Sequence, residues 1–267
     1  MLFEVNGNEA YAYTGGKTFD PKLPTVVFVH GAEFDHSVWG LQSRYLAHHG
    51  YGVLAVDLPG HGRSAGPPLA SIEDMAAWLV ATQDAAGVEQ AAVVGHSMGA
   101  LIALECAARH PGRIAKIALL GIAYPMKVSA ELLDATRDNE PLAQDMVTSW
   151  SHAAYAQYPG NPGPGFWVMG EYLRLMQRQK PGVMHVDYAA CNAYAGGAEA
   201  AAKVRCPALY LLARRDSMTP MRAAQAFANS VTNAATNLRI AVIDSSGHNM
   251  MGEKPDDVLD ALRAFLN

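Results

Sequence analysis

The pentapeptide Gly95-His-Ser-Met-Gly99 places a serine between two glycines, at the junction of an apolar run from Ala91 to Val94 and a helix-forming stretch from Met98 to Arg109. A serine at such a sharp strand-to-helix turn has a strained backbone, and side chains two positions before and after it would collide. The strain projects its hydroxyl away from the sheet, and the first amides of the helix face any negative charge that forms there. The sequence therefore predicts that Ser97 is a nucleophile.

Serine is a poor nucleophile unless a base removes its proton. Of the ten histidines, only His248 lies beyond residue 185, and it follows an apolar run that ends at Ile243. Gly247 allows the turn between them to bring the imidazole close to Ser97. We predict that His248 is the general base.

A carboxylate is needed to orient the imidazole and to stabilise its cation. Asp216 comes shortly after the apolar run Ala208–Leu212, whereas the run Ile114–Leu120 is followed by no carboxylate. We predict Asp216 as the acid. Two alternatives stay open: Asp216 caps the next helix, or Asp244, four residues before His248, takes the role.

The run that begins at Thr25 ends at His30-Gly-Ala-Glu33. The backbone N–H of Ala32 in this turn is expected to join that of Met98. Two amides aimed at one point form an oxyanion hole, which stabilises the charge on a carbonyl oxygen under attack. His30 itself is expected to hold the turn rather than to transfer protons.

Strand-like and helix-like stretches alternate along most of the chain. This order predicts the α/β class with a doubly wound, mostly parallel sheet. Continuous apolar runs such as Val53–Val56 are typical of parallel strands that are covered on both faces. A short antiparallel hairpin is expected first, with strands Leu2–Val5 and Ala10–Tyr13 around a turn at Asn6-Gly-Asn8.

The alternation breaks between residues 123 and 203. Because a structureless loop of that length is improbable in a compact domain, we interpret this region as a helical lid inserted into a core of residues 1–122 and 204–267. Its helix-like stretches are Ala130–Asp138, Leu142–Gln157 and Gly170–Gln179, separated by Asn161–Gly165 and Lys180–Gly182. Its apolar residues are expected to leave limited room over Ser97: Met126, Met146, Met169, Met176, Met184, Trp150, Tyr155, Tyr158, Phe166, Trp167 and Tyr172.

Composition excludes several classes of protein. Of the 267 residues 50% are hydrophobic and 17% charged, with a net charge of -5, so disorder and a nucleic-acid partner are not expected. The three cysteines are widely spaced, and His30 and His36 lack the spacing of a zinc protease motif, so we expect no disulfide framework, no metal and no cofactor. The N-terminus does not resemble a secretory signal, and no run of about 18 uncharged apolar residues occurs; we expect a cytoplasmic protein with no membrane partner.

The segment Asp57-Leu-Pro-Gly-His-Gly-Arg-Ser64 lacks the spacing of a phosphate loop and is interpreted as a structural turn. With His30-Gly31, Gly95–Gly99, Asp216 and His248 in this order, the chain resembles the α/β-hydrolase superfamily over nearly its whole length. The resemblance implies an eight-stranded, mostly parallel sheet and a Ser97–Asp216–His248 triad. Glu33 departs from the pattern, because many relatives have glycine there; its carboxylate is expected to narrow the site or to repel an acidic substrate.

Members of this superfamily with a serine nucleophile are mainly esterases, lactonases, thioesterases and carbon–carbon bond hydrolases, and some are described as cofactor-free haloperoxidases. Epoxide hydrolases and haloalkane dehalogenases of this fold use aspartate, so Ser97 argues against both. We expect acyl transfer on a small to medium ester or lactone, by a monomer or a homodimer.

Two further hypotheses remain. Carbon–carbon bond hydrolysis on the same triad would be favoured by a basic lid residue that holds a substrate carboxylate. The candidates are Arg174, Arg178 and Lys180. Their helical spacing, however, favours a solvated helix face. A ligand receptor that keeps the fold without turnover is the alternative outside enzymes.

Overall fold

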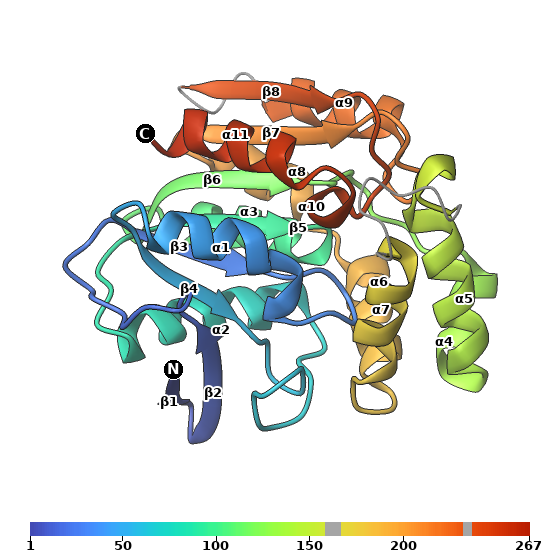
Figure 1. Cartoon of the computed structure of the whole chain (residues 1–267), viewed down its shortest axis with the longest axis horizontal. Coiled ribbons are helices and arrows are strands. Elements are labelled where there is room, and N and C mark those ends of the chain that lie inside the picture. The colour runs from blue at the N-terminus through green and yellow to red at the C-terminus, as the bar shows by residue number, and fades with distance from the viewer. Residues whose placement is uncertain (158–166, 232–236) are drawn as a thin grey trace.

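The computed structural model describes residues 1–157, 167–231 and 237–267; the Pro-Gly segment Asn161–Gly165, Tyr158 and Phe166 lie outside them. Eight strands form one sheet in the order β1-β2-β4-β3-β5-β6-β7-β8 (Figure 1). The hairpin β1–β2 pairs antiparallel with β4 at one edge, and β3 to β8 run parallel, which confirms the expected fold class. The strands are β1 (Leu2–Val5), β2 (Asn8–Tyr13), β3 (Thr25–Val29), β4 (Gly52–Val56), β5 (Ala91–His96), β6 (Ile114–Leu120), β7 (Ala208–Ala213) and β8 (Leu238–Ile243).

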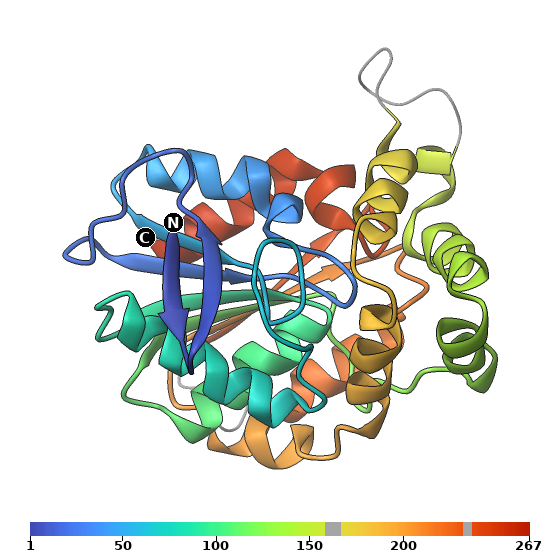
Figure 2. The same ribbon diagram turned by 90° about the horizontal axis from the view of Figure 1, so that it is seen from below.

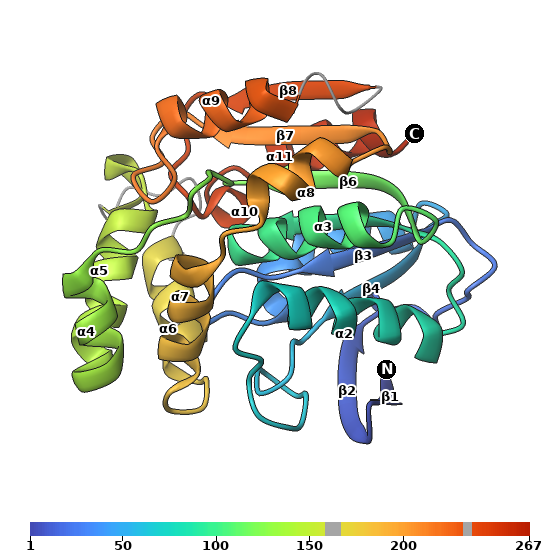
Figure 3. The same cartoon turned by 180° about the vertical axis from the view of Figure 1, so that it is seen from behind.

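Helices cover both faces of the parallel strands, which is why strands such as β3, β4 and β7 are buried at every residue. One face carries α1 (Gly40–Ala47) and α11 (Pro255–Leu266); the other carries α2 (Ile72–Ala85), α3 (Met98–Arg109) and α9 (Met221–Val231) (Figures 2 and 3). Trp39, in the short helix η1 (His36–Trp39), is fully buried in the core.

Four further helices stand together at one end of the sheet, and we call them the cap helices (Figure 1). They are α4 (Ala130–Asp138), α5 (Glu140–Ser151), α6 (Val168–Gln177) and α7 (Val183–Ala193), with a short turn of helix η2 (Ala154–Gln157) between α5 and α6. Helix α8 (Gly197–Lys203) packs instead against α3. Helix α7 was not among the expected stretches; it begins directly after Gly182, whose backbone is left-handed with φ +84°.

The cap helices lie at the carboxyl edge of the sheet, where the parallel strands end (Figures 1 and 3). The residues expected to carry chemistry follow four of those strands: Ala32 follows β3, Ser97 follows β5, Asp216 follows β7, and His248 follows β8. In open α/β sheets this edge is where ligands bind. In the part of the chain that the structure describes, no helix combines the length and the apolar character that crossing a membrane requires.

Candidate active site

Ser97 occupies the turn between β5 and α3 with φ +54° and ψ −115°, a backbone that side-chain-bearing residues rarely adopt. Its N–H donates to the Leu120 carbonyl at 2.9 Å, which ties the turn to β6. A Cβ atom at Gly95 would overlap the Gly99 carbonyl, and one at Gly99 would overlap the carbonyl of Val29. The predicted need for glycine on both sides of Ser97 is therefore met by the geometry.

His248 and Asp216 form a buried pair, with 2.8 Å between the imidazole Nδ1 and the carboxylate Oδ2. Burial opposes ionisation of Asp216, but its contacts with His248 and Thr219 outweigh it and hold the pKa of the carboxyl below its ordinary value. Because Nδ1–H donates to this carboxylate, Nε2 of His248 is left with a free lone pair. That tautomer is the one a general base requires.

Thr219 holds the Asp216 carboxylate from the other side. Its N–H donates to Oδ1 at 2.7 Å and its hydroxyl to Oδ2 at 2.6 Å. Asp244, the alternative acid, forms an ion pair with Arg214 at the surface and is largely exposed. The structure thus brings Asp216, and not Asp244, to His248.

Two residues that the sequence interpretation missed support the backbone around His248. His96 donates from Nε2 to the His248 carbonyl at 2.9 Å, and its burial lowers the pKa of its imidazole to about 3, so it is neutral. Glu253, in α10 (Met250–Glu253), accepts the N–H groups of Gly247 at 3.1 Å and Ala153 at 3.0 Å. His96 stands inside the serine motif, whereas the contact of Glu253 with Ala153 spans 100 residues and leaves no local signal.

The turn after β3 passes close to Ser97. A Cβ atom at Gly31 would lie 3.3 Å from Cβ of Ser97, so the backbone of this turn approaches the serine directly. Ala32 lines the same pocket as Ser97. Met98 is the first residue of α3, so its N–H has no acceptor within the helix. These are the two amides expected to form the oxyanion hole.

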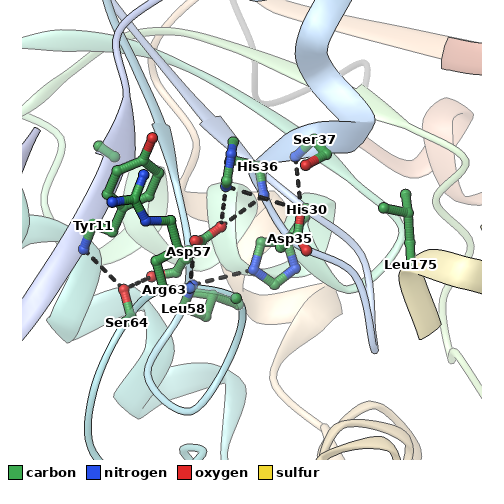
Figure 4. A network of polar contacts seen from close by, with 12 residues as sticks. Tyr11, His30, Asp35, His36, Ser37, Asp57, Leu58, Arg63, Ser64 and Leu175 are labelled. Carbon is green, nitrogen blue, oxygen red and sulfur yellow. Dashed lines mark hydrogen bonds and ion pairs between the residues drawn. The ribbon is translucent and has the colours of Figure 1, made fainter. Parts of the chain in front are cut away.

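His30 is fully buried and fixes two loops (Figure 4). Its Nε2 accepts the N–H of Leu58 at 3.1 Å, and its Nδ1 lies 2.8 Å from the Gly31 carbonyl, to which it donates. Burial lowers the pKa of this imidazole to about 4. His30 is therefore placed as predicted, holding the turn rather than facing the pocket.

The turn that begins at Asp57 is held by its own carboxylate (Figure 4). Oδ1 accepts the N–H and the Nδ1 of His36, each at 2.7 Å, and Oδ2 accepts the N–H of Arg63 at 2.9 Å. Among the described residues, Asp35, His36 and Asp57 have ligand-type atoms within 4.8 Å of one another, a spacing compatible with a metal. Protein donors already occupy both oxygens of each carboxylate, so the cluster is satisfied as a structural network.

A pocket of about 170 Å³, open to solvent, lies in front of Ser97 and Ala32. Apolar and weakly polar side chains from residues 126–132 and from the cap helices form much of its wall, among them Met126, Leu132, Trp150, Tyr188 and Cys191. Of the lid residues singled out from the sequence, Met126 and Trp150 line this pocket. Others are buried within the protein, namely Met176, Met184 and Tyr172, while Trp167 is 55% exposed.

Glu33 does not act as expected. Its side chain is buried, and its Oε1 accepts a hydrogen bond from the Tyr188 hydroxyl at 3.1 Å. Burial raises the pKa of this carboxyl well above its ordinary value, which favours its neutral form. Glu33 is not among the residues that line the pocket in front of Ser97, and its carboxyl is turned toward Tyr188. The expectation that Glu33 would narrow the site or repel an acidic substrate is therefore wrong.

None of the three basic residues weighed as carboxylate binders is among those that line the pocket. The Arg178 guanidinium forms an ion pair with the Asp35 carboxylate, with 2.9 Å from Nε to Oδ2 and 2.7 Å from Nη2 to Oδ1. Arg174 donates to Gln177 at 2.7 Å on the surface, and Lys180 is exposed.

A serine on a strained turn, at the carboxyl edge of a parallel sheet, and a buried histidine–aspartate pair at neighbouring strand ends define the class of α/β hydrolases. Residues 26–261 match the model of the alpha/beta hydrolase family. The chain belongs to this family.

Among curated proteins, the pimeloyl-[acyl-carrier protein] methyl ester esterase of Aliivibrio fischeri is 26% identical over 256 residues, which cover 91% of this chain and 93% of that protein. A putative non-heme haloperoxidase of Mycobacterium phage D29 is 38% identical over 99 residues, which cover 37% of this chain and 36% of that protein. An epoxide hydrolase of Caballeronia sordidicola is 26% identical over 196 residues, which cover 63% of this chain and 58% of that protein. The match thus spans about a third to somewhat over half of the last two proteins.

Among solved structures, the enol-lactonase from Burkholderia xenovorans LB400 superposes with a TM-score of 0.85 at 22% identity, covering 99% of each chain. Est816, described as an N-acyl homoserine lactone degrading enzyme, superposes with a TM-score of 0.82 at 21% identity, covering 99% of this chain and 100% of that one. At these identities the likeness establishes the fold.

Proposed function

We propose that the chain is a serine hydrolase that cleaves small to medium carboxylic esters or lactones through an acyl-enzyme. Two observations support the proposal: Ser97 lies on its strained turn after β5, and the buried Asp216–His248 pair follows β7 and β8 at the same edge of the sheet. Relatives and structural neighbours described as an ester esterase, an enol-lactonase and a lactone-degrading enzyme support this reaction class.

In this mechanism the Ser97 hydroxyl attacks the carbonyl carbon while Nε2 of His248 takes its proton. The Asp216 carboxylate stabilises the imidazolium that forms. The N–H groups of Ala32 and Met98 donate to the oxyanion. His248 then gives its proton to the leaving alkoxide and activates a water, which releases the acid and regenerates the serine.

Substrate size follows from the pocket. The cavity under the cap measures about 170 Å³, a size that suits a small to medium acyl group rather than a long chain. We propose that the cap helices serve as the lid and that residues 1–122 and 204–267 form the core, with α8 attached to the core through α3. We expect kcat/KM to peak at short or medium chains across p-nitrophenyl esters from acetate to palmitate. A maximum at palmitate, or activation at an oil–water interface, would contradict this.

Ser97→Ala tests the proposed nucleophile directly, and His248→Ala tests the proposed base. We expect each to lower kcat by about 10⁴-fold or more while circular dichroism stays unchanged. A fluorophosphonate probe should label the wild-type protein and leave Ser97→Ala unlabelled. Ser97→Ala activity within tenfold of wild type would refute the mechanism, and a folded wild-type protein that resists the probe would favour a ligand receptor.

Other reactions on the same triad are separable by assay. A haloperoxidase-like activity, suggested by the name of the phage relative, is tested by halogenation with peroxide and bromide. Carbon–carbon bond hydrolysis stays a candidate. Arg178 is paired with Asp35 and does not line the pocket, but Lys127 lines it and donates to the Asn192 carbonyl at 2.9 Å, so a cation stands beside the substrate space. Turnover of a ring-fission diketone tests this reaction. Epoxide hydrolysis, the activity named for another relative, is disfavoured because this chain has serine at the position where epoxide hydrolases of this fold have aspartate.

A further inference from the structure

The turn that carries Ala32 is held in place from the cap as well as by His30. The N–H of Glu33 donates to Oδ2 of Asp187 at 2.8 Å. Asp187 lies on cap helix α7 and is fully buried. This hydrogen bond joins residues 154 positions apart and fixes the peptide unit that directly follows Ala32.

Such a restraint is needed at this point of the chain. Glu33 has φ +59°, in the left-handed region that side-chain-bearing residues rarely adopt. A turn containing such a residue keeps its conformation only when the surrounding structure enforces it. If the Glu33 N–H lost its acceptor, the peptide unit between Ala32 and Glu33 would lose this restraint, and Ala32 would be held only through the Gly31 carbonyl on its other side.

The acceptor is itself fixed by a buried charge. The Nε2 atom of His61 lies 2.8 Å from Oδ2 of Asp187, the oxygen that also accepts the Glu33 N–H. The Nδ1 atom of His61 lies 3.0 Å from the Pro59 carbonyl. Both ring nitrogens face acceptors, so both must carry protons, and the imidazole is a cation paired with the Asp187 carboxylate. One carboxylate oxygen thus receives hydrogen bonds from the turn after β3 and from the turn after β4.

Neighbouring cap residues strengthen this attachment. The hydroxyl of Tyr188, the next residue on α7, donates to Glu33 at 3.1 Å and also lines the pocket. Gln179, at the end of α6, donates to Asp35 at 3.1 Å and accepts the Gly62 N–H at 3.0 Å. The cap is therefore bonded at several points to the turns that follow β3 and β4.

We propose that Asp187 is a positioning residue that sets the oxyanion hole, so that the cap is part of the catalytic apparatus as well as a cover over the pocket. This inference rests on the proposed function, because it concerns the amide of Ala32 in that reaction. Asp187 acts through the backbone of Glu33 and touches no substrate. Its removal should therefore weaken binding of the oxyanion and leave binding of the neutral substrate nearly unchanged.

The test compares three variants with wild type. Asp187→Ala removes the acceptor, and Asp187→Asn keeps an oxygen for the Glu33 N–H but loses the charge that pairs with His61. Thr136→Val is the matched control. Thr136 is buried, and its hydroxyl forms a hydrogen bond of 2.9 Å with His185, which lies on α7 as Asp187 does. This hydrogen bond does not involve the turn after β3. Each variant is measured for kcat and KM on p-nitrophenyl butyrate. Affinities are also measured for a trifluoromethyl ketone, which forms an oxyanion on Ser97, and for the matching alcohol, which does not.

For Asp187→Ala we expect kcat to fall by about 10- to 100-fold with KM within threefold, because a small displacement of an oxyanion donor costs this much. Affinity for the trifluoromethyl ketone should fall in parallel and affinity for the alcohol should not. Asp187→Asn should recover part of the loss, which keeps the test decisive if Asp187→Ala fails to fold. Thr136→Val should behave as wild type.

Three results would overturn the inference: unchanged ketone affinity in both Asp187 variants, a loss confined to KM, or an equal loss in Thr136→Val. A wild-type protein that a fluorophosphonate does not label at Ser97 would instead overturn the proposed function, and the inference with it. The two failures are therefore distinguishable.

Discussion

Two turns at the carboxyl edge of the sheet contain a residue other than glycine with positive φ, and they are stabilised in different ways. Ser97, at φ +54°, is held by the sheet beneath it and by glycines on either side. Glu33, at φ +59°, is held by Asp187 from a helix far along the chain. The glycines that the first turn needs stand within five residues, whereas the second turn also depends on a residue of the cap.

At this edge of the sheet, closeness in sequence is a poor guide to which residues interact. Asp216 and Asp244, the two candidate acids, provide the strongest test of this point. We expect Asp216→Asn to lower kcat by about 10³- to 10⁴-fold, because the imidazole would lose its orienting carboxylate. Asp244→Asn should stay within twofold of wild type, since it removes only an exposed ion pair with Arg214. Steady-state kinetics on a p-nitrophenyl ester measures both, and an Asp244 variant that was the worse of the two would reverse the assignment.

Protein stability should separate the two turns. Gly99→Ala places a Cβ atom against the backbone carbonyl of Val29, which cannot move away, and should lower the free energy of unfolding by about 3 kcal/mol or more. Glu33→Gly relieves about 1 kcal/mol of backbone strain and loses one hydrogen bond of similar worth, so its net change should be about 1 kcal/mol or less.

Urea unfolding measures the free energy of unfolding of Gly99→Ala and of Glu33→Gly. Gly112→Ala is the control, because a Cβ atom at Gly112 meets no heavy atom within 4 Å. If Gly99→Ala were as well tolerated as Gly112→Ala, the turn at Ser97 would not depend on its glycines.

A pH-dependent change in stability is expected at Glu253, which joins the loop of His248 to the cap. Burial raises the pKa of its carboxyl to about 7, although the N–H groups of Ala153 and Gly247 partly counter this. The folded protein therefore binds a proton here more tightly than the unfolded chain does. This proton's contribution to stability is fully present below the ordinary pKa of the group and is lost as the pH rises through about 7.

We expect the free energy of unfolding of the wild type to decline between pH 5 and pH 8 by at most about 3 kcal/mol on account of this group. Glu253→Gln should flatten that decline, whereas Glu131→Gln, which alters an exposed carboxyl, should not. Urea titrations at four pH values decide it. Parallel pH profiles for wild type and Glu253→Gln would show that Glu253 does not titrate in this range.

Much of the architecture could be predicted from the sequence because its determinants are local. The apolar runs of β3 to β8 and the helical stretches between them give a parallel sheet, and a parallel sheet places the residues that follow its strands along one edge. Helix α7 was missed because its apolar residues are interrupted by Asp187, whose partners lie on distant turns.

The sequence by itself determined the turn at Ser97, since the glycines that permit its backbone stand within the same pentapeptide. It also determined the order in which Asp216 and His248 follow their strands, because strand order along the chain is fixed covalently. Only the tertiary structure decided which buried groups hold those residues and what charge they carry. Burial favours the neutral form of Glu33, whereas His61 is a cation because acceptors at both ring nitrogens outweigh its burial. Neither burial nor a partner 126 or 154 residues away is encoded in local spacing.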